Sequence, residues 1–289
     1  MKKIIFILLF ACIISGPVTL LANIAMKIEL SRKNYIEYEA VYAKLTMRND
    51  SGHVLAFGAH EKLRGSVSFE ISDEYNNLIK RRNQQKIDII GTIIKPGETK
   101  QMIINLGKFY DTMPAAKYNI IAYIKHAQLP QQYQSNRAYF NITKGHVIWE
   151  RTVGIPEFVK SSRSKKINSR SYKLKTMFDG IDEIIFLTVE SKKMIYSVHK
   201  VGYTIGESPP KCEIDLLSRL HLLLPMSAKV FTYFIFDING KLEKREIYKR
   251  TTTIPILVRN HKNGMVVIAG GMLARKNLDY HDDTDEDEE

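Results

Sequence analysis

The chain has 289 residues, a length typical of about two domains, and 44% of the residues are hydrophobic, which excludes a wholly disordered protein. Its 43 basic and 31 acidic residues give a net charge of +12. Eight of the acidic residues lie within the last eleven positions, so the rest of the chain carries +20. A basic body suits an anionic partner such as phospholipid head groups, acidic glycans or nucleic acid.

The N-terminus predicts export. It begins with the positively charged Met-Lys-Lys, an apolar run follows, and Ala22 and Ala25 provide small residues for cleavage. We therefore expect residues 1–25 to be a signal peptide and the protein to be secreted or periplasmic. The alternative is a retained membrane anchor, because residues 4–25 approach the ~20 residues that a spanning helix needs. Export makes nucleic acid an unexpected partner.

The two cysteines bear on anchoring and stability. Cys12 ends the stretch Leu-Phe-Ala-Cys, which resembles a lipobox, but the apolar segment continues to Leu21, where a lipid-anchored chain turns polar. Cleavage leaves Cys212 alone, so an intramolecular disulfide is excluded and packed cores must supply the stability. We predict that Cys212 is a buried apolar residue.

Period-two alternation predicts antiparallel strands through the first half of the chain. In residues 41–48, the apolar Val41, Ala43, Leu45 and Met47 share one face and polar residues occupy the other, which indicates one buried and one solvated face. Strands recurring at short intervals are typical of a sandwich or barrel. The predicted strands are 26–30, 41–48, 53–57, 66–72, 87–94 (broken at Gly91), 101–106 and 118–124, with turns at Asn49–Gly52, Asp73–Asn77 and Pro96-Gly97-Glu98.

The residues just before the last of these strands resemble a motif of immunoglobulin domains. Tyr118 precedes Ile120 by two residues, and Ile120 stands where an immunoglobulin strand has its second cysteine, as in a tyrosine corner. The stretches Tyr35–Glu39, Asn49–Gly52, Pro96–Thr99 and Ala116-x-Tyr118 also resemble the BsuPI-type bacterial proteinase inhibitors and macroglobulin-like domains. The resemblance covers residues 26–148. It implies an immunoglobulin-like sandwich and, as an alternative function, protease inhibition.

A domain boundary is predicted after Trp149, the only tryptophan, which we expect to fill the domain junction. Residues 160–171 are rich in serine, lysine and arginine and have no apolar period. This composition is typical of a linker.

The second half also predicts strands. A pair spans 183–190 and 194–205, and a hairpin joins 230–237 to 242–250 through the turn 238–241. A last pair spans 254–258 and 265–269. Leucines at 216, 217, 220, 223 and 224 also fit a helical period, but Pro225 favours a strand over 220–224.

The order of segments from Glu213 to Gly240 resembles one blade of a sialidase-type propeller. A propeller typically needs about four to eight blades, so we predict a simple antiparallel meander. The resemblance implies a further alternative, a glycan-acting hydrolase or its accessory subunit.

Catalytic and metal-binding motifs are missing from the sequence, including GxSxG, the P-loop, GxGxxG and HExxH. His53 and His60 flank a loop with Glu61 that has the residue types of a zinc site, but solvated loop residues are the favoured interpretation. We therefore expect no catalytic, cofactor-binding or metal-binding residues. The acidic residues Asp73, Glu74, Asp179, Asp182 and Glu183 are expected to make backbone hydrogen bonds in turns.

Together these features predict an exported, non-enzymatic binding or structural protein of the cell envelope or exterior, without a cofactor. Its partner would be a macromolecule or an anionic envelope surface, and we expect the acidic tail to fold back over the basic body. The predicted all-β organisation is a signal peptide (1–25), an immunoglobulin-like β-sandwich (26–150), a basic linker (151–171), an antiparallel β domain (172–278) and a disordered acidic tail (279–289).

Overall fold

The computed structural model describes residues 24–82, 87–155, 169–206, 208–260 and 262–280. Its regular structure is strands, β1 to β21, with only two 3-10 helical turns in these ranges, η1 (Glu61–Leu63) and η2 (Leu106–Lys108). The predicted all-β class is therefore confirmed. The described residues form two compact units, the first from residues up to 31, 40–112 and 117–140, the second from 32–39, 113–116 and 141 onward.

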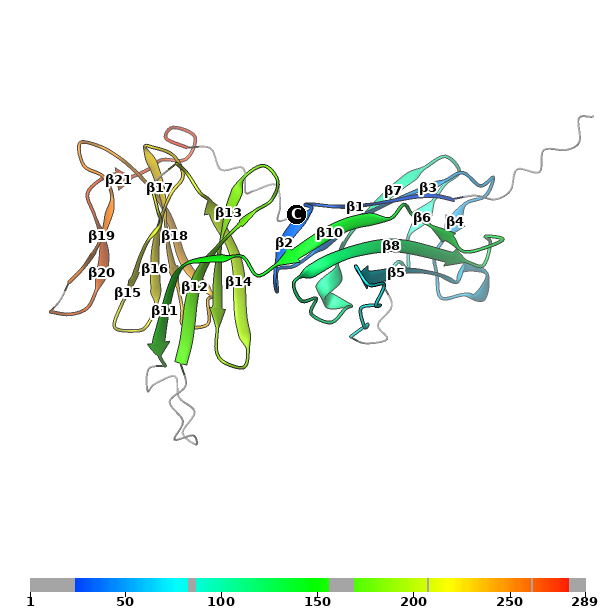
Figure 1. The fold of residues 1–289 in the computed structure, drawn as a ribbon. Coiled ribbons are helices and arrows are strands. Elements are labelled where there is room, and N and C mark those ends of the chain that lie inside the picture. Colours follow the sequence, from blue (N-terminus) through cyan, green and yellow to red (C-terminus); the bar gives the residue numbers. More distant parts are fainter. Residues whose placement is uncertain (1–23, 83–86, 156–168, 207, 261, 281–289) are drawn as a thin grey trace, which may run out of the picture. The chain divides into compact units, whose positions relative to one another are not determined.

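The first unit contains two main sheets (Figure 1). The first sheet has the order β1 (Ile24–Leu30), β3 (Tyr42–Asn49), β7 (Thr99–Asn105). The second sheet contains β10 (Ala138–Thr143), β8 (Ala116–His126) and β5 (Gly65–Asp73), with the short β9 (Tyr133–Gln134) also paired to β8. A small separate pair joins β4 (Leu55–Ala56) to β6 (Ile93–Ile94).

The core of the first unit follows the predicted alternation. Ala43, Leu45 and Met47 of β3 are fully buried, while Tyr42 is exposed. Burying each large apolar side chain contributes about 1.5–3 kcal/mol, so a few strands with one apolar face suffice to hold the unit together. Tyr118, the residue of the predicted corner, is buried and stacks on Phe140, with ring centroids 5.3 Å apart.

One edge of β1 is closed by a side chain. The Ile28 N–H donates to Asn136 Oδ1 over 2.8 Å, and Asn136 Nδ2 donates to the Ile28 carbonyl over 3.1 Å. The amide therefore satisfies both backbone groups that a neighbouring strand would have satisfied.

The predicted strand 87–94 is largely wrong. Only Ile93 and Ile94 are strand residues. Gly91 adopts φ +87°, in the left-handed region that glycine tolerates, and its N–H donates to the Phe57 carbonyl over 2.8 Å. Ile87 and Ile89 are buried from a loop, which explains why their alternation resembles that of a strand.

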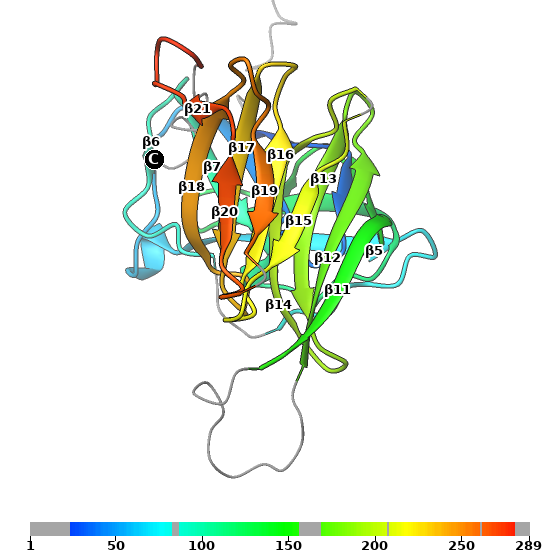
Figure 2. The same cartoon turned by 90° about the vertical axis from the view of Figure 1, so that its left-hand side faces the viewer.

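The second unit contains two larger sheets (Figure 2). One has the order β11 (His146–Gly154), β12 (Ser169–Phe178), β13 (Glu183–Glu190), β14 (Ile195–Tyr203). The other has the order β15 (Lys211–Ile214), β16 (Leu220–Pro225), β17 (Val230–Phe236), β18 (Leu242–Lys249), β21 (Met272–Leu273). Two further strands, β19 (Ile256–Arg259) and β20 (Val266–Ala269), form a hairpin. The short β2 (Asn34–Ile36) belongs to this unit and pairs in parallel with residues 141–143 of β10.

Strands that follow one another in the chain are neighbours in these sheets and pair antiparallel, as the predicted meander requires. A common core joins both sheets, with Leu174 and Leu187 from one and Leu220 and Leu222 from the other. Gly240, in the turn between β17 and β18, lies close to β14, because an added Cβ would be 1.8 Å from Ser197 Oγ.

The predicted boundary at 150 and the linker starting at 151 need correction. Arg151 pairs with Tyr172 and Gly154 with Ser169, so both ends of the predicted linker are strand. β11 and β12 therefore pair antiparallel within the second unit, and residues 156–168, which follow β11 in the sequence, lie outside the described part. Trp149 and Val153 pack against the core of that unit, so Trp149 contributes to a core and the predicted role at a junction is wrong.

Residues 1–23 of the predicted signal peptide lie outside the described ranges, whereas Ile24 and Ala25 belong to β1. Within those ranges, no helix has the length and apolar character to cross a membrane.

We expect a chain that starts at Met26 to be less stable than one that starts at Asn23. The shorter chain loses Ile24, which is buried and pairs with Asn49 of β3. Loss of this burial should lower the free energy of unfolding by about 1.5–3 kcal/mol. Urea denaturation of the two chains measures the difference, and equal midpoints would contradict the assigned start of β1.

Candidate functional site

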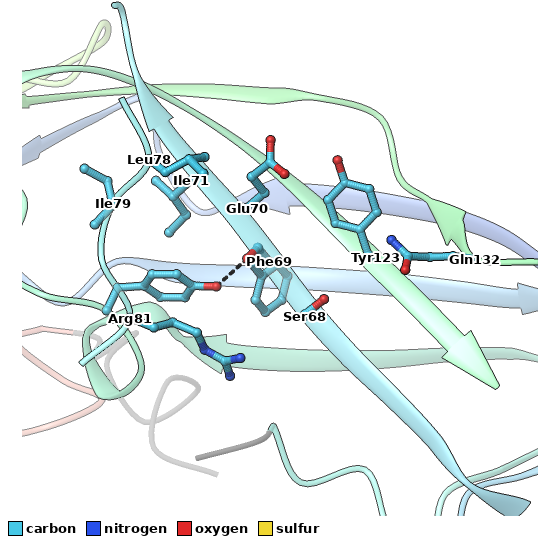
Figure 3. A pocket seen from close by; sticks show the side chains of 10 residues that line it. Ser68, Phe69, Glu70, Ile71, Leu78, Ile79, Arg81, Tyr123 and Gln132 are labelled. Atoms are coloured by element: carbon cyan, nitrogen blue, oxygen red, sulfur yellow. Dashed lines mark hydrogen bonds between the residues drawn. The ribbon is translucent and has the colours of Figure 1, made fainter. Parts of the chain in front are cut away.

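An open hollow of about 560 Å³ lies against β5 and β8 in the first unit. Figure 3 shows its walls. The polar side chains that line it are Ser68, Glu70, Arg81, Tyr123 and Gln132. Apolar residues including Phe69, Ile71, Leu78 and Ile79 provide the rest of the surface.

The alternation of β5 places part of this lining. Phe69 and Ile71 point into the core, so Ser68 and Glu70 point outward. Ser68 lies directly opposite Tyr123 of β8 in the antiparallel register. One strand pair therefore presents a hydroxyl, a carboxylate and a phenol on the same solvated face.

A returning segment builds the other wall. Asp73 holds the turn at the end of β5, because its Oδ1 accepts the N–H of Tyr75 over 2.9 Å and the N–H of Asn77 over 2.8 Å. The chain then runs back beside β5, with the Ile79 N–H donating to the Ile71 carbonyl over 2.8 Å. The role predicted for Asp73 as a turn residue is confirmed.

Tyr110 also lines the hollow and is hydrogen-bonded to β5. Its hydroxyl donates to the Phe69 carbonyl over 2.6 Å, and burial raises the pKa of this phenol. The hydroxyl thus stays protonated and satisfies a backbone group at the edge of β5.

The lining suits non-covalent binding. It offers one carboxylate, one guanidinium, two hydroxyls outside the core and one amide, and no histidine or cysteine lies among the lining residues. A nucleophile needs an adjacent base within hydrogen-bond reach, which Ser68 lacks among these residues. The residues present can make hydrogen bonds and ion pairs with a partner.

A buried polar cluster in the second unit has the residue types of a proton relay. His221 Nδ1 lies 2.6 Å from Tyr233 Oη, and His221 Nε2 lies 3.3 Å from Asp215 Oδ2. Arg219 Nε donates to the same Asp215 oxygen over 2.7 Å. This cluster was not predicted from the sequence. The signal that could have revealed it is a histidine, His221, among the leucines of 220–224.

The role of this cluster is to stabilise the fold of the second unit. His221, Asp215 and Tyr233 are all buried, so a substrate has no access to them. Asp215 Oδ1 also accepts the backbone N–H groups of Leu217 and Arg219, each over 2.9 Å, which shapes the turn between β15 and β16.

The pKa values agree with this structural role. Burial lowers the pKa of His221, and the neighbouring carboxylate of Asp215 only partly opposes the shift. Burial acts to raise the pKa of Asp215, but the hydrogen bonds from Arg219 and His221 outweigh it, so this pKa is lowered. Burial raises the pKa of Tyr233 to about 12.

The residues considered for a zinc site do not converge. His60 Nδ1 accepts the Lys62 N–H over 3.3 Å at the start of η1. Within the part of the chain that the structure describes, groups of three or more His, Cys, Asp or Glu placed to hold a metal ion are not found. Asp179 accepts the N–H groups of Ile181 and Asp182, as expected of a turn residue.

Cys212 of β15 packs against the core of the second unit, as predicted for an apolar residue, but it is only half-buried. Burial raises the pKa of its thiol, which keeps it in the unreactive protonated form.

Comparisons with known proteins show little similarity. No known family and no curated protein matches the chain. One solved structure, the sporulation control protein Spo0M from Bacillus subtilis, has 10% sequence identity over 60% of this chain and 81% of that chain, with a TM-score of 0.29. We draw nothing further from so distant a match. The resemblances to BsuPI-type inhibitors and to a sialidase blade are not confirmed.

We expect His221→Asn to reduce the loss of stability between pH 7 and pH 5. An unfolded histidine has a pKa near 6.5, whereas burial lowers the pKa of His221, so on acidification the unfolded chain gains this proton first. The stability contributed by neutral His221 is therefore lost as the pH falls below about 6.5. Urea denaturation at both pH values measures the change.

His146→Asn is the matched control, because His146 is an exposed residue of β11. The control should lose as much stability as the unsubstituted chain between the two pH values. Equal losses in all three chains would show that His221 does not couple stability to pH.

Proposed function

We propose that this chain is an exported, non-enzymatic binding protein of the cell envelope or exterior, and that the hollow against β5 and β8 contacts a macromolecular partner. The observation that carries the proposal is the composition of this hollow. It is open and rich in hydrogen-bonding side chains, and it combines a carboxylate, a guanidinium and hydroxyls on one surface.

The residue types favour a macromolecule over a small ligand. Tyr and Arg are enriched in protein interfaces, and both line the hollow, as Tyr123 and Arg81. The adjoining turn adds Tyr75 and Leu78, two large side chains that are well exposed. Small-molecule sites, in contrast, are enclosed and mostly apolar.

Export rests on the sequence of the first 25 residues, and the basic body supports an anionic surface in the envelope as a second contact. Protease inhibition and glycan hydrolysis stay as alternatives that only the sequence resemblances support. Inhibition would require stoichiometric block of a protease by the purified chain, and hydrolysis would require turnover of a glycan.

We expect Tyr123→Ala to weaken the partner complex about tenfold or more, because truncating a central aromatic side chain typically costs at least about 2 kcal/mol. The chain from Asn23 to Glu289 serves as bait in envelope extracts, and titration calorimetry with the purified partner measures affinity. Tyr139→Ala is the control, because Tyr139 is an exposed tyrosine of the same unit. Equal affinities of the two variants would overturn the assignment of the hollow.

The acidic tail is expected to affect binding of the basic body to an anionic surface. Asp279, its first acidic residue, accepts from Lys249 Nζ over 2.6 Å and from the Arg275 N–H over 2.9 Å. The tail therefore starts on a basic part of the second unit, and seven further acidic residues follow it. Such a tail would compete with an anionic partner for these cations.

We expect removal of residues 281–289 to strengthen retention on heparin resin, so that the shortened chain elutes at higher salt. The deletion removes negative charge while keeping Asp279 in place. Vesicle binding at low and high salt provides a second measurement, since screening at about 1 M salt should abolish the difference. Identical elution of both chains would show that the tail does not compete.

A further inference from the structure

The hairpin of β19 and β20 has an apolar face that points to solvent. Val258 lies opposite Val267 and Ile256 opposite Ala269, so these side chains share one face, and Met265 follows by alternation. The exposed fractions are 53% for Ile256, 39% for Val258, 58% for Met265 and 48% for Val267. We call these four residues the hairpin face.

The opposite side of the hairpin is apolar except for the exposed Arg259 at the end of β19, and its apolar residues are turned toward the protein. Val266 is buried, Leu257 and Ile268 are half-buried, and β19 contacts β15 and β16. Figure 2 shows the hairpin in front of the large sheet that contains these strands. A surface strand normally alternates apolar residues inside with polar residues outside, and the hairpin face breaks that pattern.

Apolar surface continues at the tip of the hairpin. Gly264, in the turn, lies so close to Leu216 that an added Cβ would be 2.3 Å from Leu216 Cγ. Leu216 is itself well exposed, as is Ile254 before β19. Contiguous exposed apolar residues of this kind mark an interaction surface.

The charged residues of the hairpin itself have one sign. Arg259 and Lys262 are exposed on the hairpin itself. The sequence from Ile247 to Leu278 contains no acidic residue, and its cations are Lys249, Arg250, Arg259, Lys262, Arg275 and Lys276. An apolar strip whose own charged residues are cations is the composition of elements that lie in the interface of anionic membranes.

We propose that the hairpin face docks on an anionic lipid bilayer. Ile256, Val258, Met265 and Val267 enter the boundary between head groups and acyl chains, while Lys262 in the turn pairs with a lipid phosphate. Arg259, on the other side of β19 but exposed, adds positive charge at the level of the head groups. A second copy of this chain is a poorer occupant, because it would bring like charges together at the contact. The inference relies on the proposed function for location in the envelope and is independent of the hollow.

Vesicle co-sedimentation tests the proposal, using the chain from Asn23 to Glu289, which retains every described residue. The vesicles contain phosphatidylcholine alone or phosphatidylcholine with phosphatidylglycerol. We expect binding to the anionic vesicles only. The hairpin variant combines Ile256→Thr, Val258→Thr and Val267→Thr. Threonine is β-branched, so the strands should be preserved, while the loss of apolar surface should weaken vesicle binding about tenfold or more.

The controls separate apolar from electrostatic contributions. Ile103→Thr with Ile181→Thr removes two isoleucines elsewhere that are more exposed than the hairpin face, and it should leave vesicle binding unchanged. The double variant Arg259→Gln, Lys262→Gln should bind anionic vesicles more weakly and with a smaller dependence on salt. The double variant Lys192→Gln, Lys193→Gln removes two exposed cations elsewhere and should bind like the unsubstituted chain.

Equal vesicle binding by the hairpin variant and its control would overturn the proposal, as would equal binding to both vesicle types. A change in oligomeric state of the hairpin variant, measured by light scattering with vesicle binding unchanged, would assign the face to self-association. Thermal unfolding checks that each variant is folded. Failure of the partner pull-down leaves the vesicle result unaffected, so the two proposals fail separately.

Discussion

Burial of alternate side chains between antiparallel strands is the constraint on which the rest of this structure depends. In the first unit every second residue of β3 lies in a core, as for Leu45, and in the second unit β13 and β16 are buried on both faces, as for Leu222 and Leu223. With only one cysteine in the described residues, apolar burial replaces covalent cross-links. The same alternation places polar residues on outer faces, so the candidate hollow is a direct product of the core pattern of β5 and β8.

Period-two patterning made the fold class and most strands of the second unit predictable from sequence. The hairpin of β17 and β18 and its turn are confirmed, because alternation and an Asn-Gly turn agree there. Two errors have physical causes. Ile87 and Ile89 alternate like a strand but are buried from a loop, and the serine- and lysine-rich chain after Gly154 joins two strands of one sheet.

The candidate sites were harder to foresee, because they depend on contacts between distant residues. Leu78 and Arg81 line the hollow only because Asp73 turns the chain back beside β5. The buried polar cluster combines residues from a turn and two strands, Asp215, His221 and Tyr233. No local sequence pattern predicts their contact. The hairpin face is the opposite case, since its two apolar runs are visible in the sequence and only their exposure required the structure.

The amide of Asn136, paired with both backbone groups of Ile28, has a consequence for behaviour at high concentration. An open strand margin is a template on which further copies can stack into fibres. Here the Asn136 side chain occupies the middle of this edge, and the exposed Lys27 and Glu29 of β1 add charge beside it. One amide and one ion pair therefore protect this edge against growth of a fibre.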